Sequence, residues 1–322
     1  MRVLVALGGN AMTGSDGSAT QKAQRHAIRR AMERIADVVA AGHEVVITHG
    51  NGPQVGNLLV KNELAAHVVP PVTLDWCGAQ TQATVGFTVM DTLEPALRAR
   101  GASHPVAALV TRTLVDTGDA NFTTPSKPIG RYLPREQAQV LIDHGERWED
   151  RGERGWRRVV ASPEPLEVLE TPTVVALLAA GYVVVAAGGG GIPVVRAETG
   201  EVHGVEAVID KDLTAAVLAR DVGADALVIA TDVEHATVGF GTPSERALGR
   251  VPLAELESYA ASGQFASGSM GPKVEAVLRF VRGGGRRGVI TALDRIADAV
   301  DGGAGTVVEH AAYQSPATAT ER

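Results

Sequence analysis

Residues 204–216 (GVEAVIDKDLTAA) place an acid, a base and a second acid side by side at the end of a short apolar run. The triplet is Asp210-Lys211-Asp212, and a helix-like segment follows it directly. A carboxylate at a helix start has an ordinary explanation, because it caps free backbone amides and suits the positive end of the helix dipole. In isolation, the triplet therefore predicts only a helix N-terminus.

The lysine of this triplet is informative because lysine is rare in the chain. Of the 30 basic residues, five are Lys and the rest are Arg, so the sequence uses Arg wherever a general positive charge suffices. An ammonium group is a compact point charge that suits a phosphate oxygen, whereas guanidinium is a wider planar fork. Three of the lysines lie in distinctive loops rich in Gly, Pro or Asp, and we interpret them as phosphate ligands: Lys127, Lys211 and Lys273.

Glycine-rich turns follow several apolar strands, and they suit the same class of ligand. Consecutive glycines allow backbone amides to surround phosphate oxygens. One such cluster alone is most simply a turn, but three clusters and three rare lysines together favour a phosphate site. Neither standard nucleotide-binding fingerprint is present: the P-loop pattern GxxxxGK[ST] is absent, and the spacing of the glycines does not match GxGxxG. The clusters are Gly8-Gly9, Gly50-Asn51-Gly52 and Gly188–Gly191.

Strand-like and helix-like segments alternate along most of the chain. This alternation predicts an α/β fold, a three-layer αβα sandwich around a mainly parallel sheet. Because the carboxyl ends of parallel strands share one edge, the glycine loops should converge there. The predicted strands are residues 3–7, 44–48, 106–110, 183–187, 226–231, 288–291 and 306–308, and the longest predicted helices are residues 20–41, 53–66 and 75–100.

Residues 111–165 interrupt the alternation with more Pro and charge and with two of the three tryptophans. A tract of this length without strong elements predicts an excursion or lid rather than a domain linker. We therefore expect one domain, residues 1–312, that carries a lid at 111–165. The small polar residues 313–322 are expected to form a flexible tail.

Composition restricts the classes of protein to which the chain could belong. A net charge of −7 argues against a general nucleic-acid binder. The single cysteine, Cys77, excludes a disulfide framework and a multi-cysteine zinc site, and a small buried thiol is expected there. Neither a signal peptide nor a membrane-spanning run is predicted, so we expect a cytoplasmic protein with no membrane partner. His49 could contact a ligand or have a structural role.

Eight strings of the sequence resemble those of the carbamate kinases, within the amino acid kinase superfamily. They occur in family order over nearly the whole chain, and the string at 124–130 resembles the protruding subdomain of these enzymes. Other members of the superfamily commonly have a lysine before the first glycine loop, where this chain has Ala6, so Lys127 would supply that charge. The strings are LGGN (7–10), THGNGPQVG (48–56), CGAQTQ (77–82), TPSKPIG (124–130), WRRVVASPEP (156–165), AAGGGGIPV (186–194), GVEAVIDKDL (204–213) and SGSMGPKVEA (267–276).

The resemblance implies reversible phosphoryl transfer between ATP and carbamate, giving ADP and carbamoyl phosphate, with Mg²⁺ held mainly through the phosphates. It implies catalytic roles for Lys127, Lys211, Asp212 and Lys273. Asp212 would orient the lysines, and Asp210 would do the same or help to organise the metal. Residues about 1–185 would bind carbamate or carbamoyl phosphate through Gly8, Gly9, Asn10, Asn51, Gly52, Gly189 and Gly190. Residues about 186–312 would bind the nucleotide at Asp210, Thr231, Asp232, Met270 and Gly271.

Two other functions remain open from the sequence. One is a related kinase of the same superfamily that acts on another small acid or phosphate. The other is a non-catalytic sensor of nucleotide or carbamoyl phosphate, although a sensor would not need to keep the lysines and Asp212. The resemblance also implies a homodimer, while the sequence itself shows no clear interface stripe.

Overall fold

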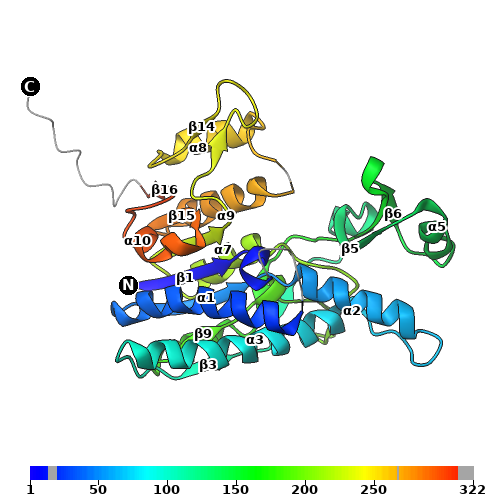
Figure 1. Ribbon diagram of the computed structural model, residues 1–322, viewed down its shortest axis with the longest axis horizontal. Helices are drawn as coiled ribbons and strands as arrows, with labels where there is room; N and C mark the ends of the chain where they lie inside the picture. The colour runs from blue at the N-terminus through cyan, green and yellow to red at the C-terminus, as the bar shows by residue number, and fades with distance from the viewer. Residues whose placement is uncertain (14–19, 267, 311–322) are drawn as a thin grey trace, which may run out of the picture.

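A mostly parallel seven-stranded sheet forms the centre of the molecule (Figure 1). The computed structural model describes residues 1–13, 20–266 and 268–310, apart from the side chain of Asn10, so the predicted tail lies outside the described residues. Six strands are parallel, and the edge strand β16 is antiparallel to β15. In spatial order the strands are β16 (Thr306–Glu309), β15 (Arg287–Ala292), β12 (Ala226–Thr231), β1 (Arg2–Leu7), β2 (Glu44–His49), β9 (Val183–Val185) and β3 (Val106–Ala108).

Helices cover both faces of this sheet, as predicted for a three-layer αβα sandwich. Alternate β1 side chains face opposite layers, with Val3 and Val5 on one side and Leu4 and Ala6 on the other. No helix in the described ranges is both long and apolar enough to cross a membrane. One layer contains α1 (Gln21–Ala40), α3 (Leu74–Ala99) and α10 (Ile296–Val300), and the other contains α6 (Thr171–Ala179), α7 (Lys211–Asp221), α8 (Leu253–Ala261) and α9 (Met270–Arg282).

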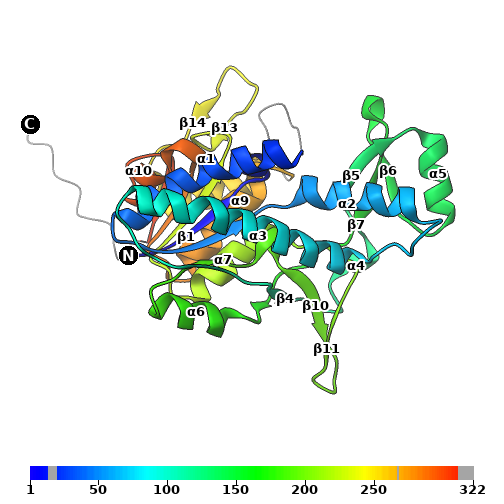
Figure 2. The same ribbon diagram turned by 60° about the horizontal axis from the view of Figure 1, so that its bottom comes forward.

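A second, four-stranded sheet lies beside the sandwich. Its hairpin is formed by β10 (Ile192–Arg196) and β11 (Val202–Gly204), and Gly200 has the positive φ of 86° that its turn requires. Figure 2 shows this hairpin projecting from the body of the molecule. The other two strands are β4 (Arg112–Leu114) and β8 (Glu167–Val168), so the first residues of the predicted excursion belong to this sheet.

A small antiparallel sheet stands apart from the sandwich in both views (Figures 1 and 2). It contains β5 (Lys127–Leu133), β6 (Trp148–Asp150) and β7 (Trp156–Val160), and α5 (Arg135–Asp143) packs beside it. Leu133, Ala138 and Trp148 form a small core of its own. This is the small protruding subdomain predicted from the sequence; that it acts as a lid with the bounds 111–165 stays a prediction.

Helix α2 (Gly52–Ala65) connects the protruding sheet to the sandwich. Val55 and Leu59 of α2 share an apolar cluster with Ile129 of β5 and with the buried thiol of Cys77 in α3. Burial raises the pKa of that thiol, as expected for a structural cysteine. The first strand of the protruding sheet is therefore held against the helix that begins at the second glycine loop.

An ion-pair cluster fixes the C-terminal edge strand β16. The guanidinium of Arg287 in β15 donates through Nε to Glu309 Oε1 at 2.8 Å and through Nη1 to the Val300 carbonyl at 2.7 Å. Arg250 pairs with the same carboxylate. Burial raises the pKa of Glu309, but the hydrogen bonds from Arg287 and Arg250 outweigh it, so the pKa lies below its ordinary value.

We expect Glu309→Gln to lower the free energy of unfolding at pH 7 by about 1–3 kcal/mol, because two arginines lose a charged hydrogen-bond acceptor. The pKa is depressed in the folded state, so the contribution of Glu309 is complete above the ordinary value of 4.5 and is lost as the pH falls through the folded-state value. Urea unfolding at pH 7 and in acid measures both effects. Glu94→Gln, in an exposed pair with Arg98, is the control and should change little; equal losses in the two variants would contradict the assignment.

Candidate active site

The glycine loops that follow β1, β2 and β9 meet at one edge of the central sheet. A Cβ placed on Gly50 would lie 3.2 Å from the backbone nitrogen of Gly9 and 3.4 Å from Cδ of Lys211. A Cβ on Gly189 would lie 2.1 Å from Nδ2 of Asn51. The absence of side chains therefore allows these segments to touch, and the convergence predicted from parallel strands is confirmed.

Asp212 lies between two lysine ammonium groups beneath this edge. It is in the first turn of α7 and is only 3% exposed. Its Oδ2 accepts from Lys273 Nζ at 2.9 Å, and its Oδ1 accepts from Lys211. Burial raises the pKa of Asp212, but the charges and hydrogen bonds of the two lysines lower it further, so the net pKa lies below the ordinary value. One ionised carboxylate thus holds two ammonium groups side by side.

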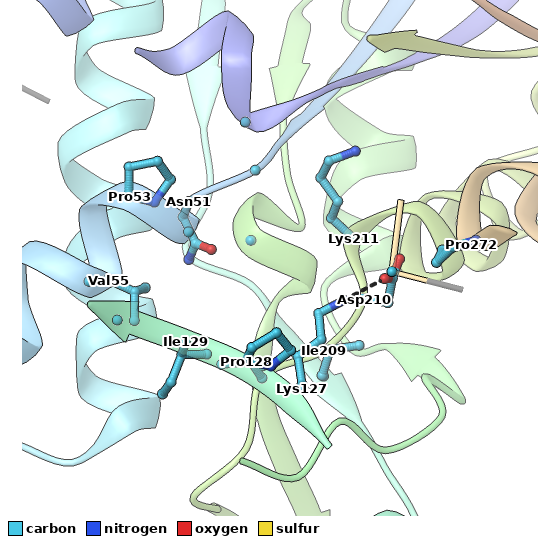
Figure 3. Close-up of a pocket in the computed structure, with 18 of the residues that line it drawn as sticks. Asn51, Pro53, Val55, Lys127, Pro128, Ile129, Ile209, Asp210, Lys211 and Pro272 are labelled. Carbon is cyan, nitrogen blue, oxygen red and sulfur yellow. Dashed lines mark hydrogen bonds and ion pairs between the residues drawn. The ribbon is translucent and has the colours of Figure 1, made fainter. Parts of the chain in front are cut away.

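Asp210 connects the start of α7 to the protruding sheet. Its Oδ1 accepts from the backbone amides of Asp212 at 2.9 Å and Leu213 at 3.4 Å, which is the N-cap predicted from the sequence. Its Oδ2 accepts from Lys127 Nζ at 2.8 Å, and Figure 3 shows this contact. The two aspartates of the triplet therefore have different lysine partners.

A pocket of about 640 Å³ opens between these groups and the protruding sheet (Figure 3). Five cationic side chains and two carboxylates line it, and such an excess of positive charge suits an anionic ligand. Three of the cations, Lys127, Arg131 and Arg157, come from the protruding sheet. Nine of the predicted site residues are in the lining: Gly9, Asn51, Gly52, Lys127, Gly189, Asp210, Lys211, Asp212 and Lys273.

The remaining predicted site residues lie beside the pocket rather than in its lining. The Gly8 amide donates to the Ala230 carbonyl at 2.9 Å, next to Thr231, whose hydroxyl donates to Asp232 at 3.0 Å. Gly190 offers its carbonyl to the hydroxyls of Thr113 and Thr214. Met270 and Gly271 begin α9, and the Asn10 side chain lies outside the described residues. The binding roles of these residues stay predictions.

The buried side chain of His49 packs against two of the glycine loops. The side chain is 1% exposed, and its Nδ1 lies 3.0 Å from the Gly50 carbonyl. A Cβ on Gly188 would lie 2.4 Å from its Nε2. Burial is the largest cause that lowers the pKa of His49 to about 4, and the Lys211 charge adds to it. The ring is therefore neutral at pH 7, and its position favours the structural alternative.

Sequence reasoning missed the polar side chains of α3 that hold the loops. Gln82 donates through Nε2 to the carbonyls of Thr111 and Gly188, both at 3.1 Å, and its Oε1 accepts from the Thr111 amide at 2.7 Å. The hydroxyl oxygen of Thr81 accepts a hydrogen bond from Asn51 Nδ2. The available signal was the string CGAQTQ, which the resemblance includes; the structure buries its Thr81 and Gln82.

Arg157 is a further pocket residue that the sequence did not indicate. It lies in β7, and its guanidinium lies 4.9 Å from the ring centroid of Tyr132. Its Nη1 also donates to the Tyr132 hydroxyl at 3.3 Å. The protruding sheet therefore presents a positioned cation to the pocket in addition to Lys127.

Comparisons with known proteins agree with this geometry. The amino acid kinase family matches residues 1–292. The chain is 47% identical over 313 residues to a carbamate kinase of Thermococcus kodakarensis, covering 95% of this chain and 98% of the relative. It is 43% identical over 312 residues to a carbamate kinase of Pyrococcus horikoshii, with coverage of 95% and 98%. A solved carbamate kinase of Giardia lamblia bound to AMP-PNP superposes with a TM-score of 0.90 at 38% identity, covering 96% of this chain and 98% of that one.

We expect Gln82→Ala to lower the free energy of unfolding by about 2–4 kcal/mol, because it leaves the buried Thr111 amide without its acceptor and removes one of the two hydrogen bonds to each of the Thr111 and Gly188 carbonyls. The matched control is Gln80→Ala, an exposed glutamine of the same helix, which should change stability by less than about 0.5 kcal/mol. Denaturant unfolding of the two variants provides the comparison. Equal stability of both variants would show that Gln82 does not support the glycine loop.

Proposed function

The chain belongs to the amino acid kinase family and has the activity of a carbamate kinase, and we propose that the pocket beside Asp212 is where it acts. There a phosphoryl group passes reversibly between ATP and carbamate, giving ADP and carbamoyl phosphate. The observation that carries this assignment is the contact of Lys211 and Lys273 with one buried carboxylate at the meeting point of the glycine loops.

The chemistry explains why such a site needs lysines rather than a strong base. A carbamate oxygen is already anionic, so no proton has to be removed before it attacks phosphorus. The barrier lies in bringing two anions together and in neutralising charge on the transferred group. Lys211 and Lys273, fixed by Asp212, provide positive charge that needs no rearrangement during the reaction.

Lys127 adds a third cation, which comes from the protruding sheet. It is the first residue of β5, it is 36% exposed, and Asp210 holds its ammonium group. In our proposal the protruding sheet closes over the substrates as a lid and brings Lys127 to the moving phosphoryl group. The chain has Ala6 where related kinases commonly have a lysine, and Lys127 supplies the missing charge.

The backbone of the glycine loops is proposed to hold the substrates. The N-terminus of α2 begins at Gly52, beside Asn51, and its free amides suit a phosphate group. Gly8, Gly9 and the loop at 188–191 complete the cradle for carbamoyl phosphate. The nucleotide is proposed to lie along the ends of β12 and α9, next to Thr231, Asp232, Met270 and Gly271.

We propose Mg²⁺ as the cofactor that accompanies ATP or ADP. In the described part of the chain, no group of three or more His, Cys, Asp or Glu side chains is arranged to hold a metal ion. Both pocket carboxylates already pair with lysines. The residues therefore fit an ion that is held mainly through phosphate oxygens. When bound, it neutralises phosphate charge.

We further propose a cytoplasmic homodimer. The single cysteine gives no disulfide framework of the kind that secreted proteins use. Trp76 and Phe87 of α3 are 63% and 49% exposed and lie about three helical turns apart on one face, which suits contact with a second copy. A particle mass in solution near the 33.4 kDa of one chain would exclude the dimer.

A coupled assay of ATP formation from carbamoyl phosphate and ADP, with Mg²⁺, tests the proposed reaction. We expect ATP in amounts that match the carbamoyl phosphate consumed. ATP formation only from another acyl phosphate would assign the chain to a related kinase. Binding of ADP and carbamoyl phosphate without any ATP would make it a sensor.

Arginine should not replace the lysines held by Asp212. Lys211 and Lys273 are only 14% and 13% exposed, so a wider guanidinium cannot occupy the same position. We expect Lys211→Arg and Lys273→Arg to lower kcat by roughly tenfold to a hundredfold, somewhat less than the loss of a whole donor. Lys22→Arg and Lys61→Arg, at exposed positions outside the pocket, are the controls and should be close to silent. Similar kcat values for all four variants would show that the rarity of lysine in this chain does not mark phosphate ligands.

Lys127 should affect the chemical step more than nucleotide binding. A contact made as the lid closes contributes to the transition state and little to the ground state. We expect Lys127→Ala to lower kcat by roughly a hundredfold and to leave the Kd of ADP nearly unchanged in calorimetry. Arg135→Ala, exposed on α5 of the same subdomain, is the control and should alter neither quantity. Loss of ADP binding at full kcat would instead place Lys127 in the nucleotide pocket.

A further inference from the structure

Asn51 occupies the N-cap position of α2 but its side chain does not cap the helix. An N-cap asparagine normally accepts a hydrogen bond from a first-turn amide through Oδ1. Here no such bond is made, and Oδ1 has no hydrogen-bond partner among the described residues. The side chain lines the pocket, and Figure 3 shows it projecting there across from Lys127 and Lys211.

The hydroxyl of Thr81 determines which end of the Asn51 amide faces which way. Thr81 is 2% exposed, and its single proton is donated to the Gly78 carbonyl at 2.8 Å. Its oxygen can then only accept, and the group it accepts from is Asn51 Nδ2 at 2.8 Å. The NH₂ end of the amide is therefore bound to α3, and the oxygen end is left for the pocket.

Gly189 holds the same amide from a second direction. A Cβ on Gly189 would lie 2.1 Å from Nδ2, 2.4 Å from Cγ and 2.6 Å from Oδ1 of Asn51. The backbone of the glycine loop thus packs directly against the plane of the amide. Contact with Gly189 and the hydrogen bond to Thr81 together fix both the position and the orientation of the side chain.

We propose that Thr81 is a positioning residue that directs Asn51 Oδ1 at the amino group of carbamate or carbamoyl phosphate. The inference rests on the proposed function and names what distinguishes this substrate within the site. Most of the pocket's polar groups are donors that recognise oxygen anions. The carboxylates of Asp210 and Asp212 already accept from lysines or helix amides. A properly directed acceptor selects an acid that carries NH₂ over one that carries a methyl group.

The experiment compares carbamoyl phosphate with acetyl phosphate, in which a methyl group replaces the amino group. Each is measured with Mg²⁺ and ADP, and acetyl phosphate is also measured as a competitive inhibitor so that slow turnover still yields a constant. The variants are Thr81→Val, which removes the hydroxyl at nearly constant shape, and Thr81→Ser, which keeps it. Thr92→Val is the matched control, because Thr92 is also buried on α3 and donates to the Thr88 carbonyl at 2.7 Å, away from the site.

We expect Thr81→Val to lower kcat/KM for carbamoyl phosphate about tenfold, the usual value of one neutral hydrogen bond. The constants for acetyl phosphate should stay nearly unchanged, and Thr81→Ser and Thr92→Val should keep the wild-type ratio between the two substrates. An equal loss for both substrates would overturn the proposal and leave Thr81 with a structural role alone. Should Thr81→Val fail to fold, Thr81→Ala tests the same ratio. A wild-type protein that makes no ATP from carbamoyl phosphate would instead refute the proposed function.

Discussion

The ionised carboxylate of Asp212 is the interaction on which the arrangement of the site depends. Two ammonium groups repel each other when they are brought together away from water. A single negative charge between them attracts both and outweighs that repulsion. The contact also ties α7 to α9, because Lys273 belongs to the latter helix. The positions of Lys211 and Lys273 are thus set before any substrate arrives, which is the property that electrostatic catalysis requires.

Much of this arrangement could be predicted from the sequence because parallel strands impose it. Apolar runs such as those before Gly8 and Gly50 indicate buried strands, and the shared edge of a parallel sheet then brings their loops together. The rarity of lysine marked Lys127, Lys211 and Lys273, and all three line one pocket. The strand after residue 182 is shorter than predicted, since Ala187 has a left-handed φ of 51° and starts the glycine turn.

Other parts could not be predicted, because their partners are distant in the sequence. Gln82 binds a carbonyl 106 residues away, and Thr81 binds Asn51 from another helix. In sequence terms each is an ordinary polar residue of a long helix. The separate partners of Asp210 and Asp212 were undetermined for the same reason: a carboxylate at a helix start suits both a capping role and a lysine. Arg157 lies in the string at 156–165 but was not singled out, because arginine is the common base of this chain.

The order of strands in the central sheet has a consequence for how the chain acquires its active site during synthesis. β1 is paired on one side with β12, and the Arg2 amide bonds to Asp225, 223 residues later. Most of the polypeptide must therefore be synthesised before β12, the strand beside the first glycine loop, is available to pair with β1. Contacts of such large sequence separation are slow to close and leave an early strand edge exposed. A ribosome-bound fragment that ends before residue 226 would contain β1, β2, β9 and β3, but it would lack β12 beside β1 and Lys273 beside Asp212. The earliest strand is therefore among the last to be completed on both sides.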